Sequence, residues 1–153
     1  MSQDPKLSST KLPASGDRTL KLSDFKGKPL VVYFYPRDNT PGCTKQGQGF
    51  RDLYDEFQAE NCEIVGVSRD TAASHDKFAA KHEFPFPLLA DTDEALCREF
   101  DVIKEKNMYG KKVMGIERST FLFDAKGKLV KAWRKVRVPG HVEEVLEAAR
   151  ALD

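Results

Sequence analysis

The spacing of apolar and polar residues divides this chain into alternating strands and helices. Two short, mostly apolar runs, Leu30–Tyr35 and Glu63–Ser68, are rich in β-branched or aromatic residues and predict buried strands. Between them, apolar residues recur at the spacing of one helical face, at Phe50, Leu53, Tyr54 and Phe57. Later in the chain, the polar segment Asp124–Lys128 separates two further apolar runs, which is typical of a β-hairpin.

Extended to the whole chain, the pattern predicts strands and helices in alternation, followed by a hairpin and a last helix. We expect strands or extended segments at 19–22, 29–36, 63–68, 84–89, 119–123 and 129–134, and helices at 41–60, 71–83, 93–100 and 140–152. This order predicts an α/β fold of the thioredoxin-like type, with a central mixed β-sheet flanked by helices on both faces. We expect one domain at 17–153, preceded by an extended N-terminal segment at 1–16.

Composition narrows the classes of function. The chain has 153 residues, of which 40% are hydrophobic and 32% charged, and its formal net charge of +1 argues against nucleic acid or an anionic membrane as the main partner. No apolar run approaches the roughly 20 residues that a membrane-spanning helix needs. The first residues lack the apolar stretch of a secretory signal, and three widely spaced cysteines do not resemble a secreted disulfide framework. We therefore expect a cytoplasmic protein.

Cys43 is the candidate for chemistry, because it falls in the first turn of the helix that leaves the strand ending near Tyr35. A free thiol with a pKa of about 8.5 is mostly protonated at neutral pH, whereas unpaired N–H groups at a helix start favour the reactive thiolate. The helix end supplies only about 0.3–1 kcal/mol, so further donors or a cation are needed. Thr40 offers a hydroxyl, Pro36 excludes water at the strand exit, and Arg118 is the candidate cation.

These residues resemble a known family. Pro36, Thr40 and Cys43 after an apolar strand, with Arg118 before Ser119-Thr120-Phe121, closely resemble the peroxiredoxins. The fuller strings are similar to the Q-type branch, the bacterioferritin comigratory proteins, and they occur in order over about residues 17–150: Phe34-Tyr35-Pro36, Thr40-Pro41-Gly42-Cys43-Thr44, Phe50-Arg51-Asp52, Gly66-Val67-Ser68 and Arg118-Ser119-Thr120-Phe121.

The resemblance implies a thiol-dependent peroxidase that reduces hydrogen peroxide and organic hydroperoxides. Cys43 would attack the hydroperoxide and become a sulfenic acid, while Thr40 holds the peroxide oxygens and Arg118 stabilises the thiolate and the separating oxygens. Pro36 would complete the site. No metal, flavin or haem is implied, and the resemblance suggests a monomer. The expected partners are a hydroperoxide and a reductant, namely thioredoxin, glutaredoxin or glutathione.

The residues that would reduce the sulfenic acid back to the thiol depart from the family pattern. Many members of the branch carry a second, resolving cysteine five residues after the first, and others carry it in the next helix; here those positions hold Gln48 and Ala79. We therefore expect a one-cysteine mechanism with an external thiol. The alternatives are that Cys62 or Cys97 resolves the sulfenic acid, or that Ala79 replaces a native resolving cysteine.

Two rival functions remain open. A disulfide oxidoreductase would need C-x-x-C, but Gln46 lies three residues after Cys43. A peroxide sensor would use the same thiol without efficient turnover. Three glycines near the start of the helix also predict that residues 42–49 unfold more readily than residues 50–60, because glycine weakens a helix interior.

Overall fold

The computed structural model describes residues 5–152, and its main feature is a mixed sheet with the strand order β2-β1-β5-β4-β3-β8-β9. The strands are β1 (Leu12–Ala14), β2 (Arg18–Leu20), β3 (Leu30–Phe34), β4 (Glu63–Ser68), β5 (Leu88–Ala90), β6 (Ile103–Met108), β7 (Lys111–Ile116), β8 (Ser119–Phe123) and β9 (Leu129–Trp133). The helices are α1 (Pro41–Asp52), α2 (Tyr54–Ala59), α3 (Ala72–His82), α4 (Ala95–Glu99) and α5 (His141–Arg150), with a 3₁₀ turn at Leu22–Phe25.

Strand β3 lies at the centre of the sheet and is buried along its whole length. It runs parallel to β4, with Phe34 opposite Val67, and antiparallel to β8, with Phe34 opposite Ser119. A strand that is covered on both faces is apolar at every position, which is why the run of six apolar residues predicted it. The end of β3 is therefore a fixed point from which the next loop starts.

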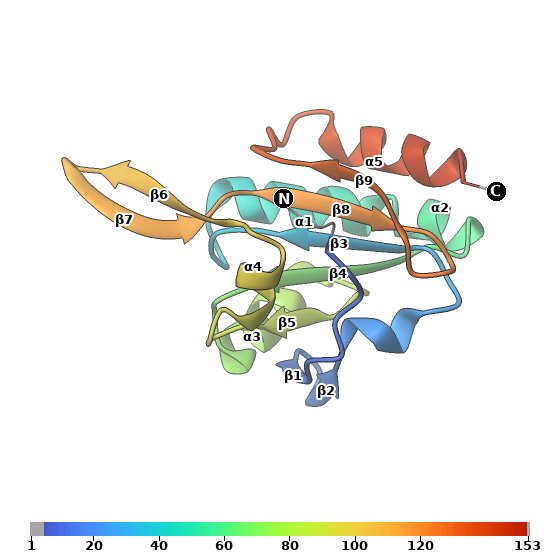
Figure 1. Cartoon of the computed structure of the whole chain (residues 1–153), viewed down its shortest axis with the longest axis horizontal. Helices are drawn as coiled ribbons and strands as arrows, with labels where there is room; N and C mark the ends of the chain where they lie inside the picture. The colour runs from blue at the N-terminus through green and yellow to red at the C-terminus, as the bar shows by residue number, and fades with distance from the viewer. Residues whose placement is uncertain (1–4, 153) are drawn as a thin grey trace.

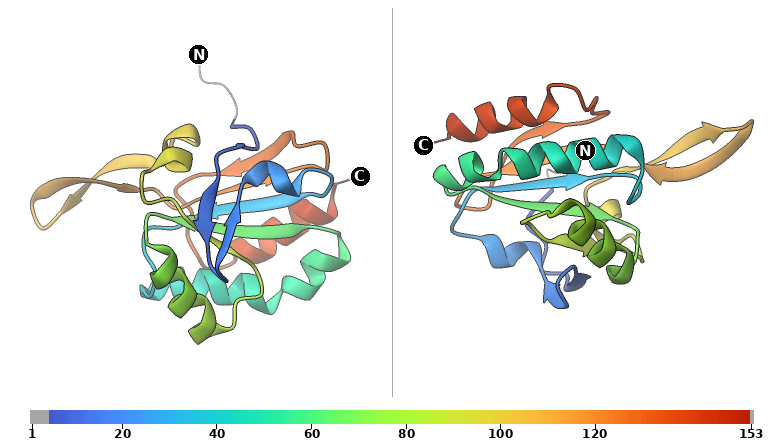
Figure 2. Two further views of the ribbon diagram at one scale, coloured as in Figure 1. Left: turned by 90° about the horizontal axis from the view of Figure 1, so that it is seen from below. Right: turned by 180° about the vertical axis from the view of Figure 1, so that it is seen from behind.

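Helices cover both faces of the sheet, as Figures 1 and 2 show, so the predicted thioredoxin-like fold class is confirmed. On one face, residues of α1, α2, α3 and α5 share a core with Val31 and Tyr33 of β3 and with Tyr35, which follows the strand. On the other, residues around α4 share a second core with the alternate β3 residues Val32 and Phe34. The alternation of side chains along a strand thus divides β3 between two cores.

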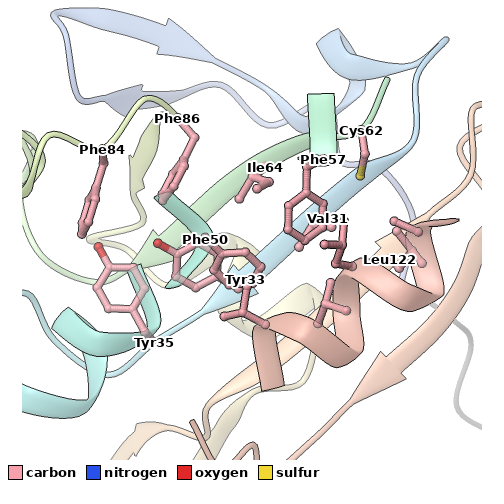
Figure 3. Packing of buried hydrophobic residues seen from close by; sticks show 14 of the residues in the cluster. Val31, Tyr33, Tyr35, Phe50, Phe57, Cys62, Ile64, Phe84, Phe86 and Leu122 are labelled. Atoms are coloured by element: carbon pink, nitrogen blue, oxygen red, sulfur yellow. The ribbon is translucent and has the colours of Figure 1, made fainter. Parts of the chain in front are cut away.

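The core that β3 shares with α1, α2, α3 and α5 is built largely from aromatic rings (Figure 3). Tyr33 stacks on Phe50 of α1 with ring centroids 4.7 Å apart, and Phe84 stacks on Phe86 at 5.3 Å. Gly66 makes room for this packing, because a Cβ there would lie 2.9 Å from Cζ of Tyr33. The first turns of α1 pack against these rings.

The predicted helix at 41–60 is wrong as a single element, because the chain forms α1 and α2 with a break at Leu53. Leu53 has φ −102° and ψ 7°, outside the α-helical range. The apolar periodicity continues through the break, so Phe50 and Phe57 are both fully buried and their rings lie 5.8 Å apart. The pattern detected the buried face correctly but carries no signal for a bend.

The N-terminal part of the chain contributes to the sheet. Residues 12–14, within the segment predicted to be extended, form β1, which pairs with β2 and places Ala14 opposite Leu89 of β5. Strand β2 is the edge strand expected at 19–22, shifted by a residue or two. The division of the chain near residue 16 stays a prediction.

The hairpin β6–β7 has no counterpart among the predicted elements. It is a separate two-stranded sheet that projects from the body of the molecule (Figures 1 and 2). Most of its positions are polar or exposed, so neither an apolar run nor a clear alternation marks it. Its turn, Tyr109–Gly110, has positive φ at both residues, as a two-residue hairpin turn requires, and Gly110 was the available signal.

Candidate active site

Cys43 occupies the third position of α1, just beyond the C-terminal end of β3. Thr40 is the N-cap residue and Pro41 the first helical residue, where the N–H that proline lacks would have no intrahelical partner. The first intrahelical bond runs from the N–H of Thr44 to the carbonyl of Thr40 (2.8 Å), which leaves the N–H of Cys43 free of the helical ladder. The side chain of Cys43 is only 2% exposed.

Arg118 supplies the cation that the sequence predicted beside Cys43. Its Nη2 donates to Sγ of Cys43 at 3.3 Å, and its Nη1 donates to Oε1 of Gln46 at 2.7 Å. Arg118 lies in the two-residue link between β7 and β8, and β8 pairs with β3. The pairing of β8 with β3 therefore brings together two residues that are 75 positions apart in the chain.

Thr40 and Pro36 lie on the loop between β3 and α1 and line one cleft together. The hydroxyl of Thr40 donates to the carbonyl of Arg37 at 2.9 Å, so it makes a local turn rather than a helix cap. Its oxygen remains able to accept a further hydrogen bond. Cys43 and Arg118 are thus in contact, and Pro36 and Thr40 lie on the loop that leads into α1, whereas the roles of all four stay predictions.

A buried ion pair anchors the same loop, and sequence reasoning did not connect its members. Asp38 Oδ2 lies 2.8 Å from Nδ1 of His75, on α3, and Nε2 of His75 lies 2.8 Å from the carbonyl oxygen of Leu89. A carbonyl and an ionised carboxylate only accept, so both ring nitrogens of His75 act as donors here. Tyr35 (2.6 Å) and Ser74 (2.7 Å) also donate to Asp38 through their hydroxyls.

These donors decide the charge of Asp38. Burial alone would raise the pKa of its carboxyl group, but the hydrogen bonds and the charge of His75, with the hydroxyls of Tyr35 and Ser74, hold the pKa below its usual value. The backbone N–H of Asp38 is also bound, to Oδ2 of Asp70 at 2.8 Å. Residue 38 is therefore fixed through both its side chain and its backbone, midway between Pro36 and Thr40.

Gln46 and Tyr33 complete the buried surroundings of the thiol. Gln46 is fully buried one turn after Cys43, and its side-chain oxygen Oε1 accepts a hydrogen bond from Arg118. Its Nε2 and the hydroxyl of Tyr33 have no hydrogen-bond partner among the described residues. Burial, and then the negative charges of Cys43 and Asp38, raise the pKa of Tyr33 well above its usual value. The hydroxyl of Tyr33 therefore stays neutral.

The other two cysteines lie elsewhere in the fold. Cys97, on α4, belongs to the core on the opposite face of the sheet from Cys43. Cys62 precedes β4, whose first residue pairs with the first residue of β3, so Cys62 lies at the end of the sheet remote from Cys43. Burial raises the pKa of both thiols, to about 12 for Cys62. In the described chain all three cysteines are free.

The two positions at which members of the branch carry a resolving cysteine hold residues that cannot form a disulfide. Ala79 lies on α3 and is packed against the aromatic core. Gln48 lies on α1, where its side-chain amide is 3.4 Å from Nδ1 of His82. Gly47, between Gln46 and Gln48, lies against Phe84, so close that a Cβ would be 2.4 Å from Cζ of that ring. Close packing therefore accounts for this glycine, whatever its effect on local unfolding.

A buried thiol in contact with a guanidinium, at the C-terminal end of the central strand of a thioredoxin-like sheet, is typical of thiol-dependent oxidoreductases. Comparison with known proteins narrows this class, because the chain matches the AhpC/TSA family over residues 5–132. It is 57% identical over 140 residues to "Peroxiredoxin Bcp" of Xanthomonas campestris, covering 92% of this chain and 88% of the relative. It is 50% identical over 141 residues to "Peroxiredoxin Bcp" of Bacillus subtilis, covering 91% and 90%.

The solved structures agree. A structure of the Xanthomonas campestris bacterioferritin comigratory protein, described with its alkyl peroxide reduction activity, has a TM-score of 0.90 at 54% identity and covers 95% of this chain and 92% of its own. A mutant of Xylella fastidiosa PrxQ has a TM-score of 0.92 at 47% identity, with coverage of 99% and 98%. The chain belongs to the AhpC/TSA family, in the Q-type, or Bcp, branch of the peroxiredoxins, and it is a thiol-dependent peroxidase.

The relatives with these names are bacterial proteins. Within residues 5–152, none of the helices has the length and apolar character needed to cross a bilayer.

Proposed function

We propose that Cys43 is the peroxidatic thiol and that the enzyme works by a one-cysteine mechanism. The contact between Arg118 and the Cys43 sulfur, at 3.3 Å, is the observation that carries the assignment. The thiolate sulfur attacks the distal peroxide oxygen, an S–O bond forms as the O–O bond breaks, and the leaving oxygen takes up a proton as water or an alcohol. Arg118 and the N–H of Cys43 stabilise the charge on the separating oxygens, and Thr40 orients them.

The positions of the remaining cysteines support an external reductant. Two cysteines form a disulfide only when their Cα atoms lie within about 7 Å. Strand β4 alone, which separates Cys62 from the end of the sheet near Cys43, spans about 16 Å. Cys97 is separated from Cys43 by the sheet itself. Neither cysteine reaches the sulfenic acid without a large rearrangement of the core.

Ala79 is the position at which a second thiol is absent. Two solved variants of the Xanthomonas campestris protein each replace one cysteine by serine, at positions 36 residues apart. The same separation of 36 residues lies between Cys43 and Ala79. This correspondence supports the view that alanine occupies the place of a resolving cysteine, whether the replacement is native or engineered.

The proposal therefore includes a thiol reductant from outside the chain, which is thioredoxin, glutaredoxin or glutathione. It also includes a monomeric, cytoplasmic protein, for which the resemblance and the sequence composition are the support.

Intact mass after one equivalent of hydrogen peroxide tests the mechanism. A retained sulfenic acid adds one oxygen, whereas an internal disulfide removes two hydrogens, and a disulfide would refute the one-cysteine mechanism. Cys43→Ser abolishes the mass change, and Cys62→Ser and Cys97→Ser are the matched controls that retain it. Steady-state consumption of peroxide with each reductant in turn then identifies the electron donor. Rapid oxidation of Cys43 without turnover by any of them would favour a peroxide sensor.

A further inference from the structure

A cleft with a volume of about 410 Å³ lies between the β6–β7 hairpin and the loop after β3, which leads to Cys43. The hairpin leaves the body of the molecule at the end where α1 begins (Figures 1 and 2). The lining residues that matter here are Pro36, Arg37, Thr40, Arg69, Lys106 and Val113. Pro36 and Thr40 belong to both the cleft and the proposed peroxide site, so the cleft adjoins the loop that leads to Cys43.

Positive charge dominates this cleft. Its described lining includes three basic side chains, Arg37, Arg69 and Lys106, and no acidic one. Arg69 is bound to Glu94 at 2.8 Å, and Glu94 is shared with Arg98. Within residues 5–152, by contrast, neither Arg37 nor Lys106 has a carboxylate within 4 Å. Two cations therefore face the cleft without an internal counter-ion.

Lys106 is held in place rather than extended into solvent. The β6–β7 register places it opposite Val113, on the face that also carries Gly115. A Cβ at Gly115 would lie 3.2 Å from Cδ and 3.5 Å from Nζ of Lys106, so the absence of a side chain there lets the lysine lie across β7. Its ammonium donates to the carbonyl of Ile116, at the base of the hairpin.

The surroundings of Lys106 are electrostatically unfavourable for a cation. Burial first, and then the positive charges of Arg118 and Arg69, lower its pKa, while the negative charges of Cys43 and Glu117 raise it. Like charges held close together repel one another, and a bound anion relieves that repulsion. The cleft therefore has the charge, the position and the partly apolar wall expected for an organic anion.

We propose that this cleft is a carboxylate-binding subsite, in which Lys106 and Arg37 bind the carboxylate of a small organic molecule whose reactive group meets Cys43. The inference rests on the proposed role of Cys43. One source of such a molecule is a hydroperoxide that bears a carboxylate, which the thiolate reduces to the corresponding hydroxy acid as described above. The other source is a thiol reductant that bears a carboxylate. Its thiolate attacks the sulfenic sulfur, an S–S bond forms, and the hydroxyl group leaves as water after taking up a proton.

Matched acids and esters test the subsite in both half-reactions at low ionic strength. In the oxidation arm, the rate constant for Cys43 is measured with a hydroperoxy carboxylic acid and with its methyl ester. In the reduction arm, the sulfenic acid is reduced by 3-mercaptopropionate and by its methyl ester, compared at equal thiolate concentration. We expect the acid to react faster in at least one arm, by about threefold to fivefold, the range for one partly exposed ion pair.

Variants then assign the preference to the cleft. Lys106→Met brings the ratio of acid to ester close to one in the arm that showed the preference, and Arg37→Gln, at an exposed side chain, lowers the same ratio. Lys112→Gln is the control, because Lys112 lies on the same hairpin but pairs with Glu105 and is 79% exposed. The arm that loses its preference identifies the source of the carboxylate.

Two outcomes overturn the inference: equal rates for acid and ester in both arms of the unaltered enzyme, or a preference that survives Lys106→Met and Arg37→Gln. Oxidation of Cys43 by hydrogen peroxide, followed by mass, is measured first in each protein. If the unaltered enzyme fails this first step, the proposed role of Cys43 is refuted, together with the subsite that depends on it.

Discussion

Replacing His75 by alanine removes one partner of a buried ion pair that holds the loop before Cys43. His75 is fully buried, and Asp38 is 6% exposed. The substitution leaves the Asp38 carboxylate buried with only the hydroxyls of Tyr35 and Ser74 as side-chain donors, and it removes the donor to the Leu89 carbonyl. The cost of an uncompensated buried charge is about 3–5 kcal/mol, a large part of the roughly 5–15 kcal/mol that stabilises a typical domain.

Urea unfolding at pH 7, followed by the fluorescence of the single tryptophan, Trp133, measures this loss. Ser74→Ala removes one hydrogen bond to the same carboxylate, and a bond to a charged group contributes about 1.5–3 kcal/mol. Lys77→Ala, at an exposed position on the same helix, is the surface control and changes stability by less than about 0.5 kcal/mol. The expected order of destabilisation is therefore His75→Ala, then Ser74→Ala, then Lys77→Ala.

The double variant Asp38→Asn/His75→Ala distinguishes the ion pair from the simple loss of packing. Because asparagine leaves no charge to bury, the double variant is expected to lose less stability than the sum of the two single losses. Oxidation of Cys43 by peroxide also slows in His75→Ala, because residue 38 lies between Pro36 and Thr40. A loss below about 1 kcal/mol in His75→Ala, or strict additivity in the double variant, would show that the pair does not anchor the loop.

Three further outcomes follow from the site and its surroundings. Gln46→Met removes the acceptor that holds Arg118, and stopped-flow oxidation of Cys43 is expected to slow about tenfold; an unchanged rate would mean that the arginine is positioned without it. Gly47→Ala places a Cβ against the Phe84 ring, so overpacking of about 1–3 kcal/mol outweighs the roughly 1 kcal/mol gain in helix propensity; increased stability in urea would contradict this packing. Burial lowers the pKa of His141 to about 4 in the folded chain, against about 6.5 in the unfolded chain. Between these two pH values the unfolded chain binds a proton at His141 and the folded chain does not. Stability contributed by neutral His141 is therefore present above pH 6.5 and is lost as pH falls towards 4; His141→Gln should flatten the urea midpoint over that range, and an unchanged slope would refute this.

Short-range sequence signals made much of the fold and of the candidate site predictable. The buried strand β3 is apolar at every position because both of its faces are covered, and such a run is visible in any sequence. Cys43 was placed correctly in the first turn of a helix, because Pro41 and the apolar spacing from Phe50 onward are short-range signals. The break at Leu53 and the polar hairpin β6–β7 were missed, because neither interrupts nor creates an apolar period.

Arg118 was the candidate cation, and the family motif supported that choice. The chain itself contains no local signal that a residue 75 positions away would meet the sulfur, and the pairing of β8 with β3 determines that contact. His75 shows the same limit more clearly: its spacing suggests no ligand cluster, yet the packing of α3 places it against Asp38.

The sequence by itself determined the class of this protein: an α/β fold, a thiol at a helix start, and positions 48 and 79 without the second thiol of its family. The tertiary structure decided which cation contacts Cys43. It also placed Cys62 at the remote end of the sheet, Cys97 on the opposite face, and Lys106 in a cleft with Pro36 and Thr40. The reason is physical. Strand and helix formation depend on neighbours within a few residues, whereas ion pairs, buried charges and clefts depend on strand order and register, which bring distant residues together.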